Sequence, residues 1–186
     1  KNLVEQLLDF RKVEQRIKKL SLFRTDISAF VRNICNSFND STSFSDDLVI
    51  FQSSFNHYVP ADRDVLNKIV RNLISNAIKY NRKGNTISVG VDNKSVTKNP
   101  LLKNVYSAGN IDKNFEAVFI TVEDKGIGIS GDLLPEIFKR FYRVDDVQNK
   151  ELGTGIGLSL VKSLVLLHKG KIVVESDPNI GTKFTV

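Results

Sequence analysis

The chain has 186 residues, of which 41% are hydrophobic, so it can bury the core of one domain and still carry an appendage. Its formal net charge of +6 is spread without a Lys/Arg block or a basic stripe with interleaved aromatics, which argues against direct nucleic-acid binding. The single cysteine, Cys35, excludes an internal disulfide, and no Cys/His cluster has metal-ligand spacing. No apolar run approaches the roughly 20 residues that span a bilayer, so a soluble piece is expected.

Residues 1–20 are predicted to form an amphipathic helix. Apolar side chains recur there at helical spacing among charged and amide residues, at Leu3, Leu7, Phe10 and Ile17. A stripe of this kind packs on its own domain or pairs with a partner helix, and the pattern alone leaves both open.

Short strands and one helix are expected next along the chain. A strand at residues 22–23 precedes a helix that begins at a cap, either Asp26 or Ser28, and continues to Phe38. A polar loop at 39–47 and a strand at 48–51 follow.

Residues 62–81 carry the strongest helical pattern. One face is apolar, and beside it Asn72, Asn76 and Lys79 fall within an arc of about 60°. An amide side chain supplies one oxygen to Mg²⁺ while water and phosphates supply the rest. Lys79 and Tyr80 are placed one turn further on to reach phosphate oxygens. Taken alone, the pattern fits a solvated helix face equally well.

The rest of the chain alternates strands with glycine-rich turns. Residues 92–114 are interpreted as a polar insertion, and a short helix is expected between two glycine-rich turns. An apolar helix at 156–168 ends before Gly170. The expected strands are 86–91, 117–123, 171–175 and 183–186. This order predicts helices that cover one face of a mixed sheet.

The run DKGIGI begins at Asp124, directly after a predicted strand. A carboxylate at a strand end accepts a hydrogen bond from an exocyclic amine, and Gly126 and Gly128 permit close approach of a ligand. Alone, the run is equally consistent with an ordinary glycine turn.

The run GTGIGL, from Gly153 to Leu158, lies immediately before the apolar helix. Glycines at a helix N-terminus expose backbone N–H groups that bind phosphate. A dinucleotide-binding reading fails because a polar segment, not a strand, precedes Gly153. A P-loop is excluded because no Lys followed by Ser or Thr ends the run.

The run IFKRFYR, from Ile137 to Arg143, contains Phe138 and Phe141 three residues apart. Such a pair is usual in a core, and here it also suits the anchor of a loop. The polar residues 145–152, which include Lys150, are then interpreted as a mobile lid.

In this order the four runs resemble the GHKL ATPase/kinase superfamily, and within it the sensor histidine kinases. The segments resemble the N box at 72–81, the first glycine box at 124–128, the F box at 138–143, the second glycine box at 153–157 and the terminal glycine motif at 181–182. The resemblance begins near residue 21. It implies an α/β (α+β) two-layer sandwich of the Bergerat type, with a mixed, mostly antiparallel sheet and ATP bound between helices and sheet.

The resemblance also implies roles for individual residues. Asn76 is expected to coordinate Mg²⁺, and Asp124 to accept the adenine amine with support from Thr182 through water. Residues expected at the nucleotide are Asn72, Asn76, Lys79, Tyr80, Asp124, Gly126, Gly128, Arg140, Arg143, Gly153, Thr154, Gly155, Gly157, Leu158 and Thr182. Those expected to act in catalysis are Asn72, Asn76, Lys79 and Arg143.

Asn72 separates kinase from hydrolase within the superfamily. The ATP hydrolases resemble this pattern but place a Glu there as general base, and an amide cannot accept that proton. A protein-histidine kinase is therefore predicted, with a GHKL-type hydrolase and a nucleotide-sensing interaction domain as alternatives. The phospho-acceptor is missing, since no His precedes His57 and neither His57 nor His168 has the expected neighbours. His168, at a helix end, is interpreted as a cap or dipole contact.

The resemblance sets out the expected context as well. Residues 1–20 resemble the end of a dimerisation helix and 21–186 the ATP-binding catalytic domain. The implied partners are ATP, the dimerisation and histidine-phosphotransfer domain of the same protein, and the receiver domain of a response regulator. The parent is expected to be a homodimeric, membrane-anchored sensor with this domain in the cytoplasm.

Overall fold

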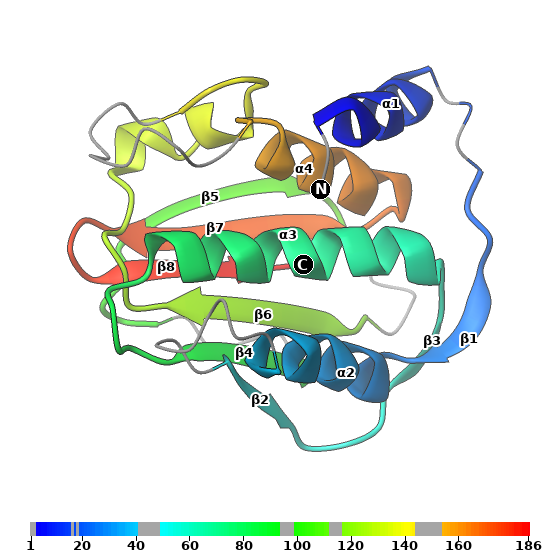
Figure 1. Cartoon of the computed structure of the whole chain (residues 1–186), viewed down its shortest axis with the longest axis horizontal. Coiled ribbons are helices and arrows are strands. Elements are labelled where there is room, and N and C mark those ends of the chain that lie inside the picture. The colour runs from blue at the N-terminus through cyan, green and yellow to red at the C-terminus, as the bar shows by residue number, and fades with distance from the viewer. Residues whose placement is uncertain are drawn as a thin grey trace.

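The computed structural model describes residues 3–15, 17, 19–40, 49–93, 99–111, 117–143 and 154–186. Within these residues a six-stranded sheet carries the fold (Figure 1). Its strands, in order across the sheet, are β2 (Val49–Ser53), β4 (Ile87–Asp92), β6 (Phe119–Asp124), β8 (Gly181–Thr185), β7 (Lys171–Asp177) and β5 (Asn104–Gly109). Only β2 and β4 pair in parallel, and the other neighbours are antiparallel. The predicted mixed, mostly antiparallel sheet is confirmed.

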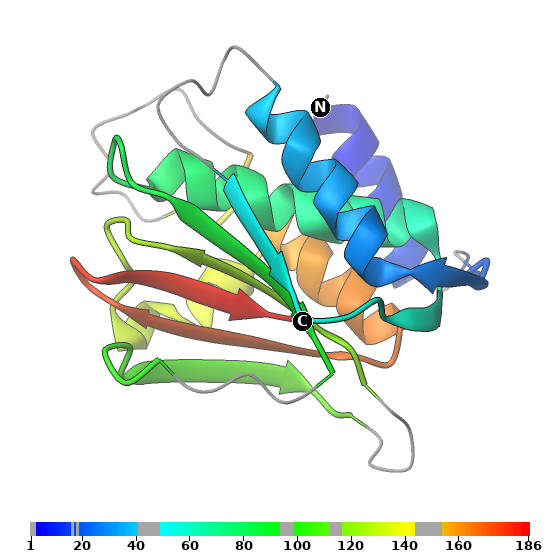
Figure 2. The same ribbon diagram turned by 90° about the horizontal axis from the view of Figure 1, so that it is seen from below.

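Three helices cover one face of this sheet, as Figure 2 shows. They are α2 (Ile27–Asn39), α3 (Arg63–Tyr80) and α4 (Gly157–Leu167). A further helix, α1 (Leu3–Glu14), lies against α4 on the side away from the sheet (Figure 1). A separate antiparallel pair, β1 (Phe23–Asp26) and β3 (Tyr58–Ala61), stands beside the helices. The two-layer sandwich is therefore confirmed, with α1 as an appendage. No described helix is long and apolar enough to cross a membrane.

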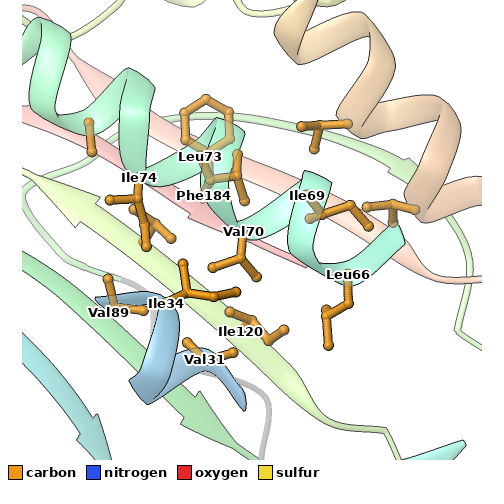
Figure 3. Close-up of a cluster of buried hydrophobic side chains, with 14 of the residues drawn as sticks. Val31, Ile34, Leu66, Ile69, Val70, Leu73, Ile74, Val89, Ile120 and Phe184 are labelled. Carbon is orange, nitrogen blue, oxygen red and sulfur yellow. The ribbon is translucent and has the colours of Figure 1, made fainter. Parts of the chain in front are cut away.

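The core lies between α3 and the sheet. Leu66, Val70 and Leu73 recur every three or four residues, which places them on one face of α3 (Figure 3). They pack with Ile120 of β6 and Phe184 of β8 in a continuous buried cluster. Because the apolar face can point only toward the sheet, this packing also fixes the direction of the polar residues beside it.

Both predicted helix starts are held by aspartate caps. Asp26 accepts a hydrogen bond from the Ala29 backbone N–H at 3.0 Å, so the cap of α2 is Asp26 and not Ser28. Asp62 caps α3: its Oδ1 accepts from the backbone N–H groups of Asp64 and Val65, each at 3.1 Å.

The second oxygen of Asp62 holds a distant segment. Its Oδ2 accepts a hydrogen bond from the Ser21 backbone N–H at 3.0 Å, in the connection after α1. The Asp62 backbone N–H donates to His168 Nε2 at 3.4 Å, while His168 Nδ1 lies 3.2 Å from the Leu164 carbonyl oxygen. His168 is therefore the C-cap residue of α4, as expected.

The structure corrects four sequence predictions. The first helix ends at Glu14 rather than residue 20, and the strand expected at 22–23 begins at Phe23. The expected short helix is instead two 3-10 turns, Gly131–Leu133 and Glu136–Phe138. The polar insertion 92–114 contains β5.

Two strands gave only a weak sequence signal. β5 lies at a sheet edge, and its apolar residues Val105, Tyr106 and Ala108 do not alternate regularly with polar ones, so its strand pattern is weak. β3 has only four residues and includes a proline, so it escaped prediction altogether.

Candidate functional site

A cavity of about 470 Å³ lies between the helix layer and the sheet. It opens beside the C-terminal half of α3, the end of β6, the start of β8 and the first turn of α4. Its lining residues are Asn76, Ala77, Tyr80, Asp124, Ile127, Gly128, Ile129, Ser130, Leu133, Ile137, Tyr142, Arg143, Leu158, Pro178, Asn179, Thr182 and Phe184. A mostly apolar wall with a few convergent polar groups is typical of a small-ligand site.

Helix α3 contributes an amide and a phenol to the cavity. Asn76 lies on the flank of the buried face, and its side-chain amide makes no hydrogen bond to the part of the chain that the structure describes, so this amide is available to a ligand. Tyr80 follows one turn later, and its hydroxyl accepts a hydrogen bond from Lys79 Nζ at 2.7 Å. Lys79 itself does not line the cavity but holds its charge at the edge, over the Tyr80 ring.

Asn72 occupies the contact between α3 and α4 rather than the cavity. Its Nδ2 donates to the Lys68 carbonyl oxygen at 2.7 Å, inside the helix. Its Oδ1 would lie 3.0 Å from a Cβ on Gly157, in the first turn of α4. The amide is thus packed where the two helices meet.

The end of β6 and the start of β8, with Asp124 and Thr182, form the floor of the cavity. Asp124, the last residue of β6, places a carboxylate there. It is 7% exposed, and its Oδ1 accepts a hydrogen bond from the Gly126 backbone N–H at 2.8 Å. Burial raises the pKa of Asp124 from 3.8 to about 6, although hydrogen bonds from the Gly126 and Thr182 backbone oppose the rise and Glu123 adds to it. The carboxyl group therefore titrates close to neutral pH.

A hydroxyl network beside Asp124 sets the polarity of the floor. Ser176 Oγ donates to the Gly181 carbonyl oxygen at 2.8 Å and accepts from the Ile129 backbone N–H at 2.9 Å. A hydroxyl has one proton, so in the 2.9 Å contact between Ser176 and Thr182 the Thr182 hydroxyl is the donor. Thr182 lines the cavity, and with its proton given to Ser176 its hydroxyl can only accept there. Together with Asp124 it makes a wall of acceptors, which suits a ligand that donates.

Two glycines in the loop after Asp124 are required by close backbone contacts. A Cβ on Gly126 would lie 2.0 Å from the Tyr80 carbonyl oxygen, and one on Gly128 would lie 1.8 Å from the Asp177 carbonyl oxygen. Gly128 also has a φ of +68°, which side chains disfavour. These contacts press the loop between α3 and the turn that joins β7 to β8. The glycine pattern thus shapes the cavity, although only Gly128 lines it.

The opposite wall comes from residues 131–143 and the start of α4. Tyr142 and Arg143 line the cavity with Leu158, in the first turn of α4. The Phe141 backbone N–H donates to the Gly155 carbonyl oxygen at 3.0 Å and joins this wall to the glycine-rich run. Gly153 and the expected lid at 145–152 lie outside the described residues.

Arg140 points away from the cavity. Its guanidinium carbon lies 3.9 Å from the centre of the Phe10 ring on α1, a cation–π contact between α1 and the segment after the turn Glu136–Phe138. The residue expected at the triphosphate thus contacts the appendage in this structure.

The cavity gathers about half of the residues that the sequence singled out. Those that line it are Asn76, Tyr80, Asp124, Gly128, Arg143, Leu158 and Thr182. The others described lie nearby or elsewhere and do not line it: Asn72, Lys79, Gly126, Arg140, Thr154, Gly155 and Gly157. Lining residues that the sequence did not reveal include Leu133, Pro178 and Asn179. The turn-forming pair Pro178 and Asn179 was the one available signal, and it marks a turn without saying what the turn touches.

The sequence pattern of the family described as "Histidine kinase-, DNA gyrase B-, and HSP90-like ATPase" matches residues 61–186. The chain is 30% identical over 186 residues to the sensor protein EvgS of Escherichia coli (strain K12), which covers 99% of this chain and 14% of that protein. It is 28% identical over 184 residues to the sensor histidine kinase WalK of Bacillus subtilis (strain 168), covering 98% of this chain and 27% of that protein. The chain thus spans only a small part of these relatives.

Solved structures resemble the fold along nearly the whole chain. Full-length ShkA in complex with AMPPNP matches with a TM-score of 0.75 at 22% identity, over 98% of this chain and 34% of that one. The Acinetobacter baumannii histidine kinase AdeS matches with a TM-score of 0.68 at 23% identity, over 98% of this chain and 74% of that one. At these identities the likeness establishes the shared fold.

The raised pKa of Asp124 predicts a pH-dependent stability difference. Because the folded chain holds this proton more tightly than the unfolded chain, the contribution of Asp124 to folding is complete below about pH 4 and is lost as pH rises through about 6. Asp124→Asn cannot ionise, so it should exceed the parent in stability at pH 8, by on the order of 3 kcal/mol. The difference should vanish below about pH 4. Urea unfolding across this range measures it.

Asp132→Asn is the matched control, since Asp132 is exposed and does not line the cavity. It should follow the parent at every pH. A constant gap between Asp124→Asn and the parent would contradict the buried, proton-holding carboxyl.

Proposed function

This chain belongs to the histidine kinase-, DNA gyrase B- and HSP90-like ATPase family, and we propose that it is the ATP-binding catalytic domain of a sensor histidine kinase. The observation that carries the proposal is the acceptor wall of Asp124 and Thr182 in the same cavity as the free amide of Asn76. One end of the cavity suits a base with an exocyclic amine. The other, with Tyr80 and Arg143, suits phosphates.

The base is proposed to lie on the floor at the end of β6. An adenine amine donates to the Asp124 carboxylate, and the apolar side chains of Ile127, Ile129 and Leu133 cover the ring faces. Guanine has a carbonyl oxygen where adenine has its amine. That oxygen would face only the acceptor oxygens of Asp124 and Thr182. The floor therefore selects adenine over guanine.

The phosphates are proposed to lie between α3 and the first turn of α4. Arg143 and the N-terminal end of α4 supply positive potential there, and Lys79 stands at the edge beside Tyr80. Asn72 lies behind this site and fixes the spacing of the two helices through Gly157.

The donor set fits Mg²⁺ in the way this ion is usually bound with nucleotides. Asn76 offers one amide oxygen, with no competing hydrogen bond among the described residues, while phosphate oxygens and water complete six ligands. Bound there, the ion would neutralise charge on the triphosphate. Asn76 is the one protein ligand proposed.

The proposed reaction moves the γ-phosphoryl group of ATP to a histidine ring nitrogen. The nitrogen lone pair forms a P–N bond, the bond to the β,γ-bridging oxygen breaks with its electrons leaving on ADP, and the ring N–H proton passes to solvent. The domain's residues hold the triphosphate in line with that nitrogen. The acceptor is proposed to stand on the dimerisation helices, of which residues 1–20 are the last part.

The same context supplies the onward step and the partners. The phosphohistidine would pass its phosphoryl group to an aspartate of a response-regulator receiver domain. The dimerisation helices would make the parent a homodimer, with this domain on the cytoplasmic side of a membrane-anchored sensor. The relatives named as a sensor protein and a sensor histidine kinase support the sensor context of this proposal.

Hydrolysis by this domain is disfavoured by what lies around the cavity. Among its described lining residues Asp124 is the only carboxylate, and it already accepts the Gly126 backbone N–H. Asn72, at the position of the hydrolase base, has an amide that cannot take a proton from water. The arrangement therefore favours transfer to an external nucleophile.

Nucleotide selectivity is the direct test of the floor. The parent should bind ATP at least about ten-fold more tightly than GTP, because guanine leaves buried acceptors unpaired. Asp124→Asn should reduce the preference for ATP over GTP, since an amide also donates a hydrogen bond. Asp132→Asn should leave this preference unchanged. Calorimetry with both nucleotides measures it. Equal affinities in the parent would refute the adenine assignment.

Magnesium dependence tests Asn76. Asn76→Ala should weaken ATP binding by about five-fold or more in the presence of Mg²⁺ and change it little in EDTA, because the amide acts through the ion. Ser75→Ala, an exposed neighbour on α3, is the control and should match the parent in both buffers. An equal loss for Asn76→Ala in EDTA would assign the amide to the nucleotide itself.

Activity should depend on the missing histidine. The chain alone should bind ATP but neither label itself nor release phosphate quickly, because lack of a general base lowers a rate by on the order of 10²–10⁴-fold. Joining upstream helices that carry a histidine followed by an acidic residue should produce an acid-labile phosphoryl label from [γ-³²P]ATP. Rapid phosphate release by the chain alone, abolished by Asn72→Ala, would identify a hydrolase instead.

A further inference from the structure

Strand β5 supports one side of the candidate nucleotide site. It comes from the polar insertion, forms the edge of the sheet beside β7, and pairs along its whole length from Asn104 to Gly109. None of its residues lines the cavity. Its inward-facing residues nevertheless contact the segment 131–143, which forms one cavity wall.

Tyr106 is the centre of these contacts. Its ring centroid lies 5.3 Å from that of Phe138, and the two rings are tilted by 30°. Lys162 of α4 donates from Nζ to the Tyr106 hydroxyl at 3.2 Å. The same Nζ lies 5.7 Å from the Tyr106 ring centre and 5.6 Å from that of Phe138. One side chain of the insertion therefore joins β5, the turn at Phe138 and α4.

Phe138 leads directly into the cavity wall. It is buried at 6% exposure, next to Ile137, which lines the cavity. Tyr142 and Arg143 follow within five residues along the chain and line it too. Backbone hydrogen bonds near the turn are mostly local, such as that from Lys139 to Glu136 at 2.8 Å, and the one from Phe141 reaches Gly155. Side-chain contacts at Phe138 therefore decide where this wall lies.

A second contact ties the start of β5 to the other side of the cavity. Asn104 Nδ2 donates to Asp177 Oδ1 at 2.8 Å, and the Lys103 backbone N–H donates to the other carboxylate oxygen. The Asp177 carbonyl oxygen is the atom that packs against Gly128. β5 thus holds the Gly128 loop at one end and the Phe138 turn in its middle.

We propose that Tyr106 is a positioning residue for nucleotide binding, acting through Phe138 on Tyr142 and Arg143. The inference rests on the proposed function and adds to it a residue outside the cavity. Tyr106 and Lys162 hold the wall in place before the nucleotide arrives, so binding costs less ordering of that segment. The ring carries most of the effect because it stacks on Phe138. The hydroxyl adds the link to Lys162.

The test compares three variants of the whole chain at a temperature well below melting. Tyr106→Leu should weaken ATP binding by about five-fold or more, Tyr106→Phe should restore it to within about two-fold of the parent, and Val105→Ala should match the parent. Val105 lies on the same strand and is 49% exposed. Hydrogen exchange without nucleotide should speed up at residues 137–143 in Tyr106→Leu and not in the other two.

ATP affinity and hydrogen exchange test the proposed function and the role of Tyr106 separately. A parent that binds no ATP would refute the proposed function, and exchange at 137–143 would still decide whether Tyr106 positions the wall. Unchanged affinity and unchanged exchange in folded Tyr106→Leu would overturn the positioning role. If Tyr106→Leu does not fold, Tyr106→Phe and Lys162→Met replace it. Lys162→Met should then weaken binding by about two-fold or more, because it also removes the charge beside both rings. Adding Tyr106→Phe to it should weaken binding no further, because the hydroxyl acts through Lys162. Three variants that all bind ATP like the parent would overturn the link.

Discussion

The packing of α3 onto the sheet is the constraint on which the rest of this structure depends. Its apolar face, with Leu66, Val70 and Leu73, is buried and admits one rotation of the helix. That rotation sends Asn76 and Tyr80 into the cavity and Asn72 toward α4. Gly126 of the first glycine loop then packs against the backbone carbonyl of Tyr80. Core and site are thus two faces of one helix, and a change in its packing moves both.

The candidate site contains two features that destabilise the folded chain. Burial of the Asp124 carboxylate opposes its ionisation, and its hydrogen bonds from the backbone offset only part of that cost. Phe141 stands at a φ of +61°, where a phenylalanine is strained, between the Phe138 turn and Gly155. Both features lower the stability of the folded chain at the candidate site.

Local patterns in the sequence predicted much of this arrangement, and long-range contacts supplied the remainder. The periodicity of α3 and the spacing of strands and glycine runs are short-range signals, so the helix and the layered fold followed from them. The role expected of Asp124 came from the family resemblance, because its glycine run alone also fits an ordinary turn. The contact of Tyr106 with Phe138 joins residues far apart in sequence, and so does that of Arg140 with Phe10. The sequence around these residues carries no pattern that predicts either contact. β5 went unrecognised for the same reason, since only β7 makes it a strand.

Asp62 has a consequence for the cooperativity of the fold. One residue joins segments separated by 41 residues on one side and 106 on the other, through Ser21 and His168. Its carboxylate is buried, with only 7% of the residue exposed, so loss of the Ser21 hydrogen bond takes a partner from a buried polar group. The connection after α1, the first turn of α3 and the end of α4 therefore tend to open together. Detachment of α1 and its connection would therefore also open the first turn of α3, the helix that carries Asn76. These segments would open as one unit and not as separately frayed ends.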